Sequence, residues 1–378
     1  MGILSPAALI LFLLFAVASF VLLITYWRKL ARRSPKTIAL RILALFTCNL
    51  LIVLSLGLAL NDYGTFYSSW SELFGIQTVE PSITEAQVNP ISKLDIASGI
   101  TNSDGSVLLR QAITGDQSKV VATILTLLPP DYVQGVLSGK GQDSNTVFHV
   151  IELLPGYPGS PTTWIRGMNV ESYLQQARVA GTLPHAIIVI PQMNILPHKD
   201  TECLDVPNGP QVETWLAKDV VSYEKKFLGI GNRRWGVAGY STGGWCSAML
   251  TLKNPNQYIA GAPIAGYFEP RFATPFPPES LAEMTKRYDI KSIAFLAPPA
   301  VQMLFVNSTK DRTTNVETQK FVALMRKPIK TSVITLVGAG HNLKAWTKVE
   351  PALFRWFGDV FKASENPYVP NKPTSTTH

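Results

Sequence analysis

The first sixty residues contain two long apolar segments. Residues 7–27 carry no charged side chain, and residues 38–60 carry one, Arg41, close to their start. As an α-helix the first segment would be about 31 Å long at 1.5 Å per residue, which matches the apolar core of a bilayer. The pattern predicts two membrane-spanning helices, at residues 7–27 and 38–60.

A short basic segment separates these two helices. Residues 28–37 contain five Lys and Arg side chains and no acidic one. Short loops rich in Lys and Arg stay on the cytoplasmic side of a membrane. We therefore expect a plasma-membrane protein with two helices, a cytoplasmic loop at residues 28–37 and an extracytoplasmic chain from residue 61 onward. The lipid bilayer is then one of its partners.

Two other interpretations of the apolar segments remain open. The small residues Ala16 and Ala18 flank Val17, as at the cleavage site of a signal peptide. However, no basic residue precedes the first apolar run, and the run continues for nine positions beyond Ala18, which favours a retained helix. The third possibility is a buried hairpin in the core of a soluble protein.

Beyond residue 90, strand-like apolar runs alternate with helix-like stretches. Several of the runs are almost continuously apolar, as buried parallel strands require. This alternation predicts an α/β fold with a mostly parallel sheet and helices on both faces. The expected strands are residues 120–128, 147–154, 186–190, 235–238, 259–264, 301–306 and 332–337. The expected helices are residues 169–180, 212–227, 243–253, 314–326 and 343–361.

These patterns divide the chain into four parts. Residues 1–60 form the membrane hairpin, and residues 61–90, which are polar and broken by Gly and Pro, form an extracytoplasmic connector. Residues 91–363 form the α/β domain. Residues 364–378, rich in Pro, Thr and Asn, are expected to be a disordered tail.

The net charge of +8 belongs almost entirely to the membrane segment. Residues 1–60 contain six basic residues and no acidic one, whereas the other 318 residues contain 28 basic and 26 acidic residues. Nucleic-acid binding needs a basic stripe on the folded part of a protein. We therefore expect no nucleic-acid partner.

The motif GYSTGG at residues 239–244 predicts a catalytic serine. It follows an expected strand and begins an expected helix, which is the arrangement of a nucleophile elbow around Ser241. Small flanking residues allow the serine its strained backbone conformation, and the N–H groups of the helix face the developing charge. The non-catalytic alternative is a glycine-rich turn in which Ser241 only caps the helix.

A serine nucleophile requires a base and an acid, which follow it along the chain in this fold. Of the five histidines, only His341 lies downstream in a loop directly after the last expected strand. Asp311 ends the loop after the preceding strand and would orient His341. Glu317 is the reserve acid, but it falls within an expected helix. Surface-loop roles are the alternatives for His341 and Asp311.

Two backbone N–H groups are expected to form the oxyanion hole. One belongs to Thr242, the residue after the nucleophile. The other belongs to Tyr157 in the loop LPGYPG at residues 154–159, because Pro158 has no N–H to offer.

The chain has three cysteines, too few for a disulfide scaffold. Cys48 lies in the second apolar segment and is expected to pack there. Cys203 and Cys246 lie in the exported part, where oxidation is permitted. They form either a disulfide or two separate buried thiols.

With these residues in hand, the chain resembles the esterase D and mycolyltransferase family of the α/β-hydrolase fold over about residues 91–362. The motifs that carry the resemblance are LLPPDY at 127–132, LPGYPG at 154–159, DTEC at 200–203, the elbow at 235–244 and GHN at 340–342. The membrane-anchored actinobacterial members are the most similar. The resemblance implies a Ser-acid-His acyl-enzyme mechanism with no metal and no organic cofactor. Mycolyltransferases usually have Met after the nucleophile and Glu as the acid, whereas this chain has Thr242 and Asp311.

The leading hypothesis is a membrane-anchored, extracytoplasmic serine esterase or acyltransferase. Its substrate would be an acyl ester or a lipid of the cell envelope, and water or a sugar hydroxyl would resolve the acyl-enzyme. A serine peptidase with the same triad is a weaker alternative. A catalytically silent envelope-binding or scaffold protein is the alternative from another class, although a scaffold has no need of an intact triad.

Overall fold

The computed structural model describes residues 6–30, 34–64, 70, 88–139, 146–272 and 276–365. It divides into two compact units, Met1–Glu80 and Pro81–His378. Most of the expected connector and nearly all of the expected tail lie outside the described residues.

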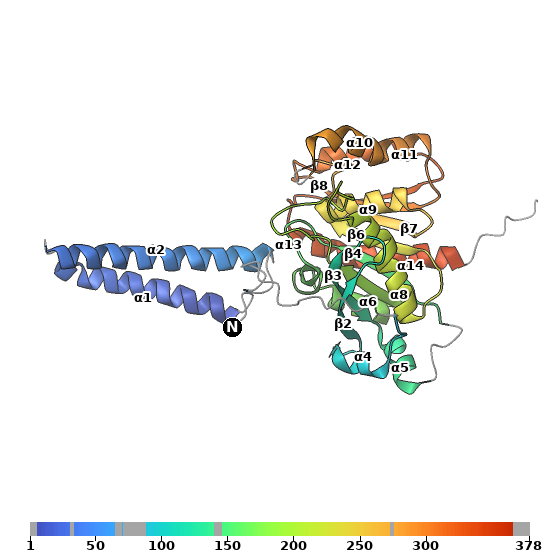
Figure 1. Ribbon diagram of the computed structural model, residues 1–378. Coiled ribbons are helices and arrows are strands. Elements are labelled where there is room, and N and C mark those ends of the chain that lie inside the picture. Colours follow the sequence, from blue (N-terminus) through green and yellow to red (C-terminus); the bar gives the residue numbers. More distant parts are fainter. Residues whose placement is uncertain are drawn as a thin grey trace, which may run out of the picture. The chain divides into compact units, whose positions relative to one another are not determined.

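The first unit is a pair of helices, α1 (Pro6–Leu30) and α2 (Pro35–Gly64), which pack against each other (Figure 1). Both are longer than the expected segments, and most of their large apolar side chains are exposed. The spans Ala7–Arg28 and Pro35–Asn61 are long and apolar enough to cross a membrane, and only 17% of each is buried, whereas a core helix of a soluble protein is mostly buried. A signal sequence near an N-terminus meets the same test of length and composition.

The second unit is built on a nine-stranded sheet in the order β1-β2-β3-β5-β4-β6-β7-β8-β9. The strands from β4 to β9 run parallel to one another, and β1, β2 and β3 each run antiparallel to their neighbours. The sheet is therefore mostly parallel, as the sequence predicts. The strands are β1 (Ile100–Thr101), β2 (Val107–Thr114), β3 (Val121–Leu128), β4 (His149–Leu154), β5 (Ala186–Pro191), β6 (Trp235–Tyr240), β7 (Tyr258–Ile264), β8 (Gln302–Ser308) and β9 (Lys330–Leu336).

Helices cover both faces of this sheet (Figure 1). One core lies between the sheet and α5, α8, α9, α11 and α12, and a second lies between the sheet and α6, α13 and α14. The α-helices are α4 (Lys93–Ser98), α5 (Pro130–Ser138), α6 (Val170–Val179), α7 (Val212–Thr214), α8 (Val221–Leu228), α9 (Thr242–Lys253), α10 (Leu281–Arg287), α11 (Ile290–Leu296), α12 (Asn315–Val322), α13 (Leu343–Trp346) and α14 (Glu350–Glu365). Shorter helical turns are η1 (Thr163–Gly167), η2 (Trp215–Val220), η3 (Pro278–Ser280) and η4 (Thr347–Val349).

All seven expected strands are present, and the observed structure adds β1 and β2 at one edge of the sheet. The expected helix at residues 212–227 is interrupted by the π-helical turn η2, between α7 and α8. The sequence did not predict the helices α10 and α11. Helix α11 packs against α9, and the predicted helix α12 packs against β8. Helix α14 extends to Glu365, two residues beyond the expected end of the domain.

Two glutamates are fully buried beneath the helices on the α8 and α9 side. Glu152 on β4 accepts a hydrogen bond from the Tyr258 hydroxyl at 2.6 Å, and Glu224 on α8 accepts one from the Thr126 hydroxyl at 2.7 Å. Burial raises the pKa of Glu152 to about 8 and that of Glu224 to about 7, because a charged carboxylate loses its hydration there. Near neutral pH the folded protein therefore holds protons that the unfolded chain releases.

Replacing Glu152 by Gln should weaken the pH dependence of the free energy of unfolding. Folded protein keeps the Glu152 proton up to about pH 8, whereas the ordinary pKa is 4.5, so wild-type protein loses stability as the pH rises through this window. Gln still accepts the Tyr258 hydrogen bond but does not titrate. The stability of the variant relative to wild type should rise with pH, by at most about 1.4 kcal/mol per pH unit.

Urea denaturation of the detergent-solubilised full chain at a series of pH values measures this effect. The matched control is Glu279→Gln, since Glu279 is exposed on η3 and its replacement should leave the slope unchanged. Equal slopes for wild type and Glu152→Gln would contradict the prediction.

Candidate active site

The turn between β6 and α9 holds Ser241 in a conformation that is rare for an L-amino acid, with φ 55° and ψ −120°. The neighbouring glycines make the turn possible because there is no room for a side chain. A Cβ at Gly239 would lie 2.2 Å from the Gly243 carbonyl oxygen, and a Cβ at Gly243 would lie 2.3 Å from the Leu154 carbonyl oxygen. The strand, the strained serine and the helix are the parts of a nucleophile elbow.

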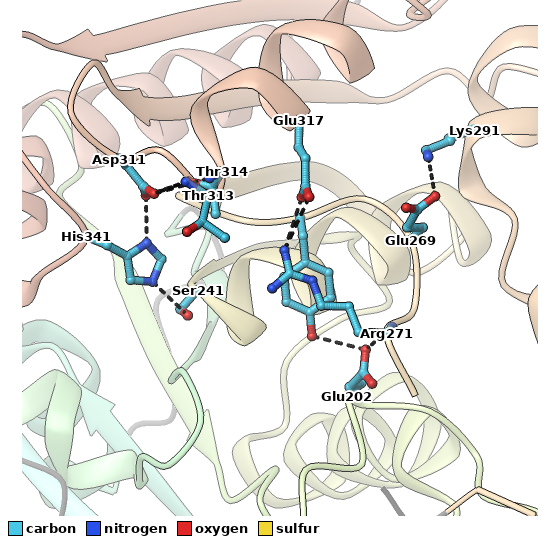
Figure 2. Close-up of polar contacts among 11 residues, drawn as sticks. Glu202, Ser241, Glu269, Arg271, Lys291, Asp311, Thr313, Thr314, Glu317 and His341 are labelled. Carbon is cyan, nitrogen blue, oxygen red and sulfur yellow. Dashed lines mark hydrogen bonds and ion pairs between the residues drawn. The ribbon is translucent and has the colours of Figure 1, made fainter. Parts of the chain in front are cut away.

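The structure brings Ser241, His341 and Asp311 together (Figure 2). His341 Nε2 lies 3.0 Å from Ser241 Oγ, and His341 Nδ1 lies 2.6 Å from Asp311 Oδ2. Asp311 follows β8 and His341 follows β9, so the three residues come from three parallel strands. An ionised carboxylate only accepts hydrogen bonds, so Nδ1 carries the hydrogen and Nε2 of the neutral ring accepts from the serine hydroxyl.

Asp311 is 2% exposed and is held by its own loop. It accepts hydrogen bonds from the Thr314 hydroxyl at 2.5 Å and from the backbone N–H groups of Thr313 and Thr314 at 3.1 and 3.2 Å. Burial alone would raise the pKa of Asp311, but the Thr314 hydroxyl and His341 stabilise the carboxylate and the net pKa is lowered. Asp311 is therefore ionised at neutral pH.

The reserve acid, Glu317, has a different partner. It lies in α12, where the sequence places it, and its carboxylate pairs with Arg271 Nη2 at 3.3 Å rather than with His341 (Figure 2). Asp311, and not Glu317, is therefore the carboxylate that contacts His341.

Two other histidines are paired with carboxylates away from Ser241. His149 Nε2 lies 2.7 Å from Glu365 Oε1, and His185 pairs with Asp131. His378 lies outside the described residues.

The loop at residues 154–159 lies against the nucleophile. A Cβ at Gly156 would come within 3.1 Å of Ser241 Cβ, and Asn194 Nδ2 donates hydrogen bonds to the carbonyl oxygens of Gly156 and Gly159 at 3.0 and 2.6 Å. Tyr157 is the next residue in this loop, and Thr242 begins α9 on the other side of Ser241. Their N–H groups stay the predicted oxyanion donors.

A cavity of about 330 Å³ opens beside Ser241. All nine residues that line it have polar side chains, but their carbon atoms contribute more of the cavity surface than their nitrogen and oxygen atoms do. The lining residues are Asp200, Glu202, Ser241, Thr242, Tyr267, Arg271, Thr313, Thr314 and His341.

The far wall of the cavity is a hydrogen-bonded group that the sequence analysis did not assign to the site. Glu202 accepts from the Tyr267 hydroxyl at 3.2 Å and from the Arg271 backbone N–H at 2.8 Å, and the Arg271 guanidinium lies 4.2 Å from the centre of the Tyr267 ring. DTEC at residues 200–203 was part of the resemblance, but neither it nor Arg271 has a spacing that points to a site. Among the described residues, no group of three or more His, Cys, Asp or Glu is placed to hold a metal ion.

Cys203 and Cys246 form a disulfide, and both residues are fully buried. The bond fastens the DTEC loop to the second turn of α9. In the described chain Cys48 is the free cysteine, buried in α2.

No known family profile matches the chain. An uncharacterized protein of Corynebacterium glutamicum is 23% identical over 205 residues, which is 53% of this chain and 43% of that protein. The matched segment thus spans less than half the length of this relative.

Solved structures of esterases share the fold of the second unit. A ferulic acid esterase superposes with a TM-score of 0.56 at 16% identity, covering 68% of this chain and 99% of the esterase. An S-formylglutathione hydrolase from Agrobacterium tumefaciens gives 0.56 at 15% identity, covering 70% and 99%. A fluorophosphonate-binding serine hydrolase from Staphylococcus aureus gives 0.53 at 15% identity, covering 67% and 98%. The second unit therefore has the α/β-hydrolase fold, as the resemblance implied.

Removing the disulfide should destabilise the α/β-hydrolase unit. The variant Cys203→Ala/Cys246→Ala lacks the cross-link that closes 43 residues of the chain, and the free energy of unfolding should fall by about 2–4 kcal/mol. Urea denaturation of the full chain, followed by tryptophan fluorescence, measures the change. Cys48→Ala, which removes a cysteine outside this unit, is the control and should leave this transition unchanged. An unaltered midpoint in the double variant would contradict the expectation.

Proposed function

We propose that this chain is a serine esterase or acyltransferase, tethered to the membrane by α1 and α2, that acts through an acyl-enzyme on an ester or lipid of the cell envelope. The observation that carries the proposal is the chain of hydrogen bonds from Ser241 through His341 to Asp311, set at a nucleophile elbow. The fold shared with esterases supports the same class of chemistry.

In the first half of the reaction, Ser241 Oγ attacks the carbonyl carbon of the ester while His341 Nε2 takes the hydroxyl proton. The ionised Asp311 stabilises the resulting imidazolium. The N–H groups of Thr242 and Tyr157 stabilise the oxyanion, each worth on the order of 10² to 10³ in rate. The C–O bond to the alcohol then breaks, and the alcohol leaves with the proton from Nε2.

In the second half, water or another hydroxyl attacks the acyl-serine. His341 again takes the proton, the tetrahedral intermediate collapses, and Ser241 leaves with the proton restored. Hydrolysis and acyl transfer differ only in the attacking hydroxyl. The cavity presents both polar groups and carbon surface beside Ser241, which supports a substrate with polar and apolar parts there.

A tether explains how a soluble-type enzyme fold would work on envelope lipids. Two membrane spans hold the α/β-hydrolase unit near the bilayer, where such esters are concentrated. The basic residues between the helices favour a cytoplasmic loop and a catalytic unit outside the cytoplasm.

Ser241 should react with a fluorophosphonate probe, because the probe forms a covalent bond with an activated serine. Ser241→Ala should abolish labelling and the turnover of a short acyl ester. His341→Ala should do almost the same, and the double variant should lose no more than either, because the residues act as a unit. Asp311→Asn should lower turnover by about 10⁴, since the imidazole then has the wrong tautomer.

The matched control is Glu317→Gln, because Glu317 pairs with Arg271 instead of His341 and its change should be nearly neutral. A large loss of turnover in Glu317→Gln together with a small loss in Asp311→Asn would show that Glu317, and not Asp311, is the acid of the triad. A folded wild-type protein that does not react with the probe would favour a catalytically silent binding protein.

A reporter enzyme that is active only outside the cytoplasm should be active when fused after His378. The five basic residues between the helices anchor their loop in the cytoplasm, so replacing them with neutral residues should weaken this orientation. Reporter activity measured in intact cells checks the arrangement. A cytoplasmic C-terminus in the wild-type protein would contradict the proposed location.

A further inference from the structure

The DTEC loop, residues 200–203, is joined to the start of α9 at three points. The Thr242 hydroxyl donates a hydrogen bond to Asp200 Oδ2 at 3.1 Å, and Trp245 Nε1 donates one to the Glu202 carbonyl oxygen at 2.9 Å. The third link is the disulfide to Cys246. The three helix residues are spaced i, i+3 and i+4 and so share one face of α9. The loop therefore lies along the N-terminal end of the nucleophile helix.

This end of α9 needs outside support because it contains two adjacent glycines. A Cβ at Gly243 would lie 2.3 Å from the Leu154 carbonyl oxygen, and one at Gly244 would lie 2.8 Å from the Ile264 carbonyl oxygen. Close backbone approach thus requires glycine at both positions, yet glycine weakens a helix. The three links attach on both sides of the glycine pair, at Thr242 and at the residues that follow Gly244.

Asp200 makes the link nearest to the nucleophile. Its side chain is 9% exposed, and both carboxylate oxygens are used: Oδ1 accepts from the Glu202 backbone N–H at 2.8 Å and Oδ2 from Thr242. Burial raises the pKa of Asp200 to about 6, so the group is largely ionised at neutral pH. Burying a carboxylate costs free energy, which the two hydrogen bonds only partly offset.

We infer that Asp200 is a positioning residue of the oxyanion hole, which fixes the Thr242 side chain and so aims the Thr242 N–H at the oxyanion. The inference rests on the proposed function, because an oxyanion forms only if Ser241 attacks an ester. A misaligned donor weakens binding of the transition state more than binding of the substrate. Loss of the Asp200–Thr242 hydrogen bond should therefore lower kcat and leave KM nearly unchanged.

Steady-state kinetics on a short acyl ester test this inference, with the detergent-solubilised full chain and active sites counted by fluorophosphonate titration. Asp200→Ala and Thr242→Val should each lower kcat by about 10- to 100-fold, with KM within about twofold of wild type. The double variant should lose no more than the larger single loss, because both changes break the same hydrogen bond.

Conservative variants should rescue the activity. Asp200→Asn can accept from the Glu202 N–H with its oxygen and donate to the Thr242 hydroxyl with its amide, and Thr242→Ser keeps the hydroxyl. Both should retain kcat within about threefold of wild type, since a hydrogen bond between neutral groups is only moderately weaker than one to a carboxylate. These near-isosteric changes also keep the test valid if Asp200→Ala fails to fold.

Thr251→Val is the matched control for loss of a buried hydroxyl in the same helix. The Thr251 hydroxyl bonds to the Ser247 carbonyl oxygen at 2.7 Å, more than two turns from Ser241, so the variant should keep wild-type kcat per active site. Wild-type kcat in Asp200→Ala and Thr242→Val, additive losses, or an equal loss in Thr251→Val would overturn the inference. Failure of the proposed function looks different, because either the wild-type protein would then not react with the probe or Ser241→Ala would keep labelling and turnover.

Discussion

The strained backbone of Ser241 is the constraint around which the α/β-hydrolase unit is arranged. A positive φ at a non-glycine residue costs about 1–3 kcal/mol and persists only where the surroundings enforce it. Here the Ser241 N–H donates to the Ile264 carbonyl oxygen at 2.9 Å, and the Ser241 carbonyl oxygen accepts from the Gly244 N–H at 2.9 Å. Both hydrogen bonds require β7 and α9 to pack closely against the turn. This close packing requires glycine on both sides of Ser241, because a side chain at those positions would push β7, α9 and the turn apart.

The direction of the strands explains why residues far apart in sequence meet at this turn. The strands β4, β6, β8 and β9 are parallel, so the loops that follow them leave the sheet at the same edge. The loop at residues 154–159, Ser241, Asp311 and His341 follow these four strands in turn. Strand β6 lies between β4 and β7 near the middle of the sheet. The loops that follow the neighbouring strands therefore flank Ser241 on both sides, and their residues can contact it.

The sequence predicts those elements whose burial produces a clear pattern of apolar residues along the chain. Strand β5 is buried on both faces and reads as a continuous apolar run. Strand β2 was not predicted because it is exposed along much of its length and carries Arg110 and Gln111 among its apolar residues. Helices α10 and α11 have seven residues each, too few for a helical periodicity to stand out.

The same reasoning separates the parts of the candidate site. The motif around Ser241 and the order serine, acid, histidine are local signals, so Ser241, Asp311 and His341 could be named from the sequence. The cavity wall of Glu202, Tyr267 and Arg271 could not, because contacts between residues up to 69 positions apart create it.

Burial alone does not decide the state of the carboxyl groups in this protein. Asp311 and Glu152 are both almost inaccessible to solvent, yet the pKa of Asp311 is lowered and that of Glu152 is raised to about 8. Asp311 receives hydrogen bonds from Thr313, Thr314 and His341, whereas Glu152 receives one from Tyr258. Several donors replace the water that an ionised carboxylate loses, and one donor does not. The fold can therefore keep a charged acid beside His341 and a neutral one in the sheet, because Asp311 has more hydrogen-bond donors than Glu152 and lies less deeply in the protein.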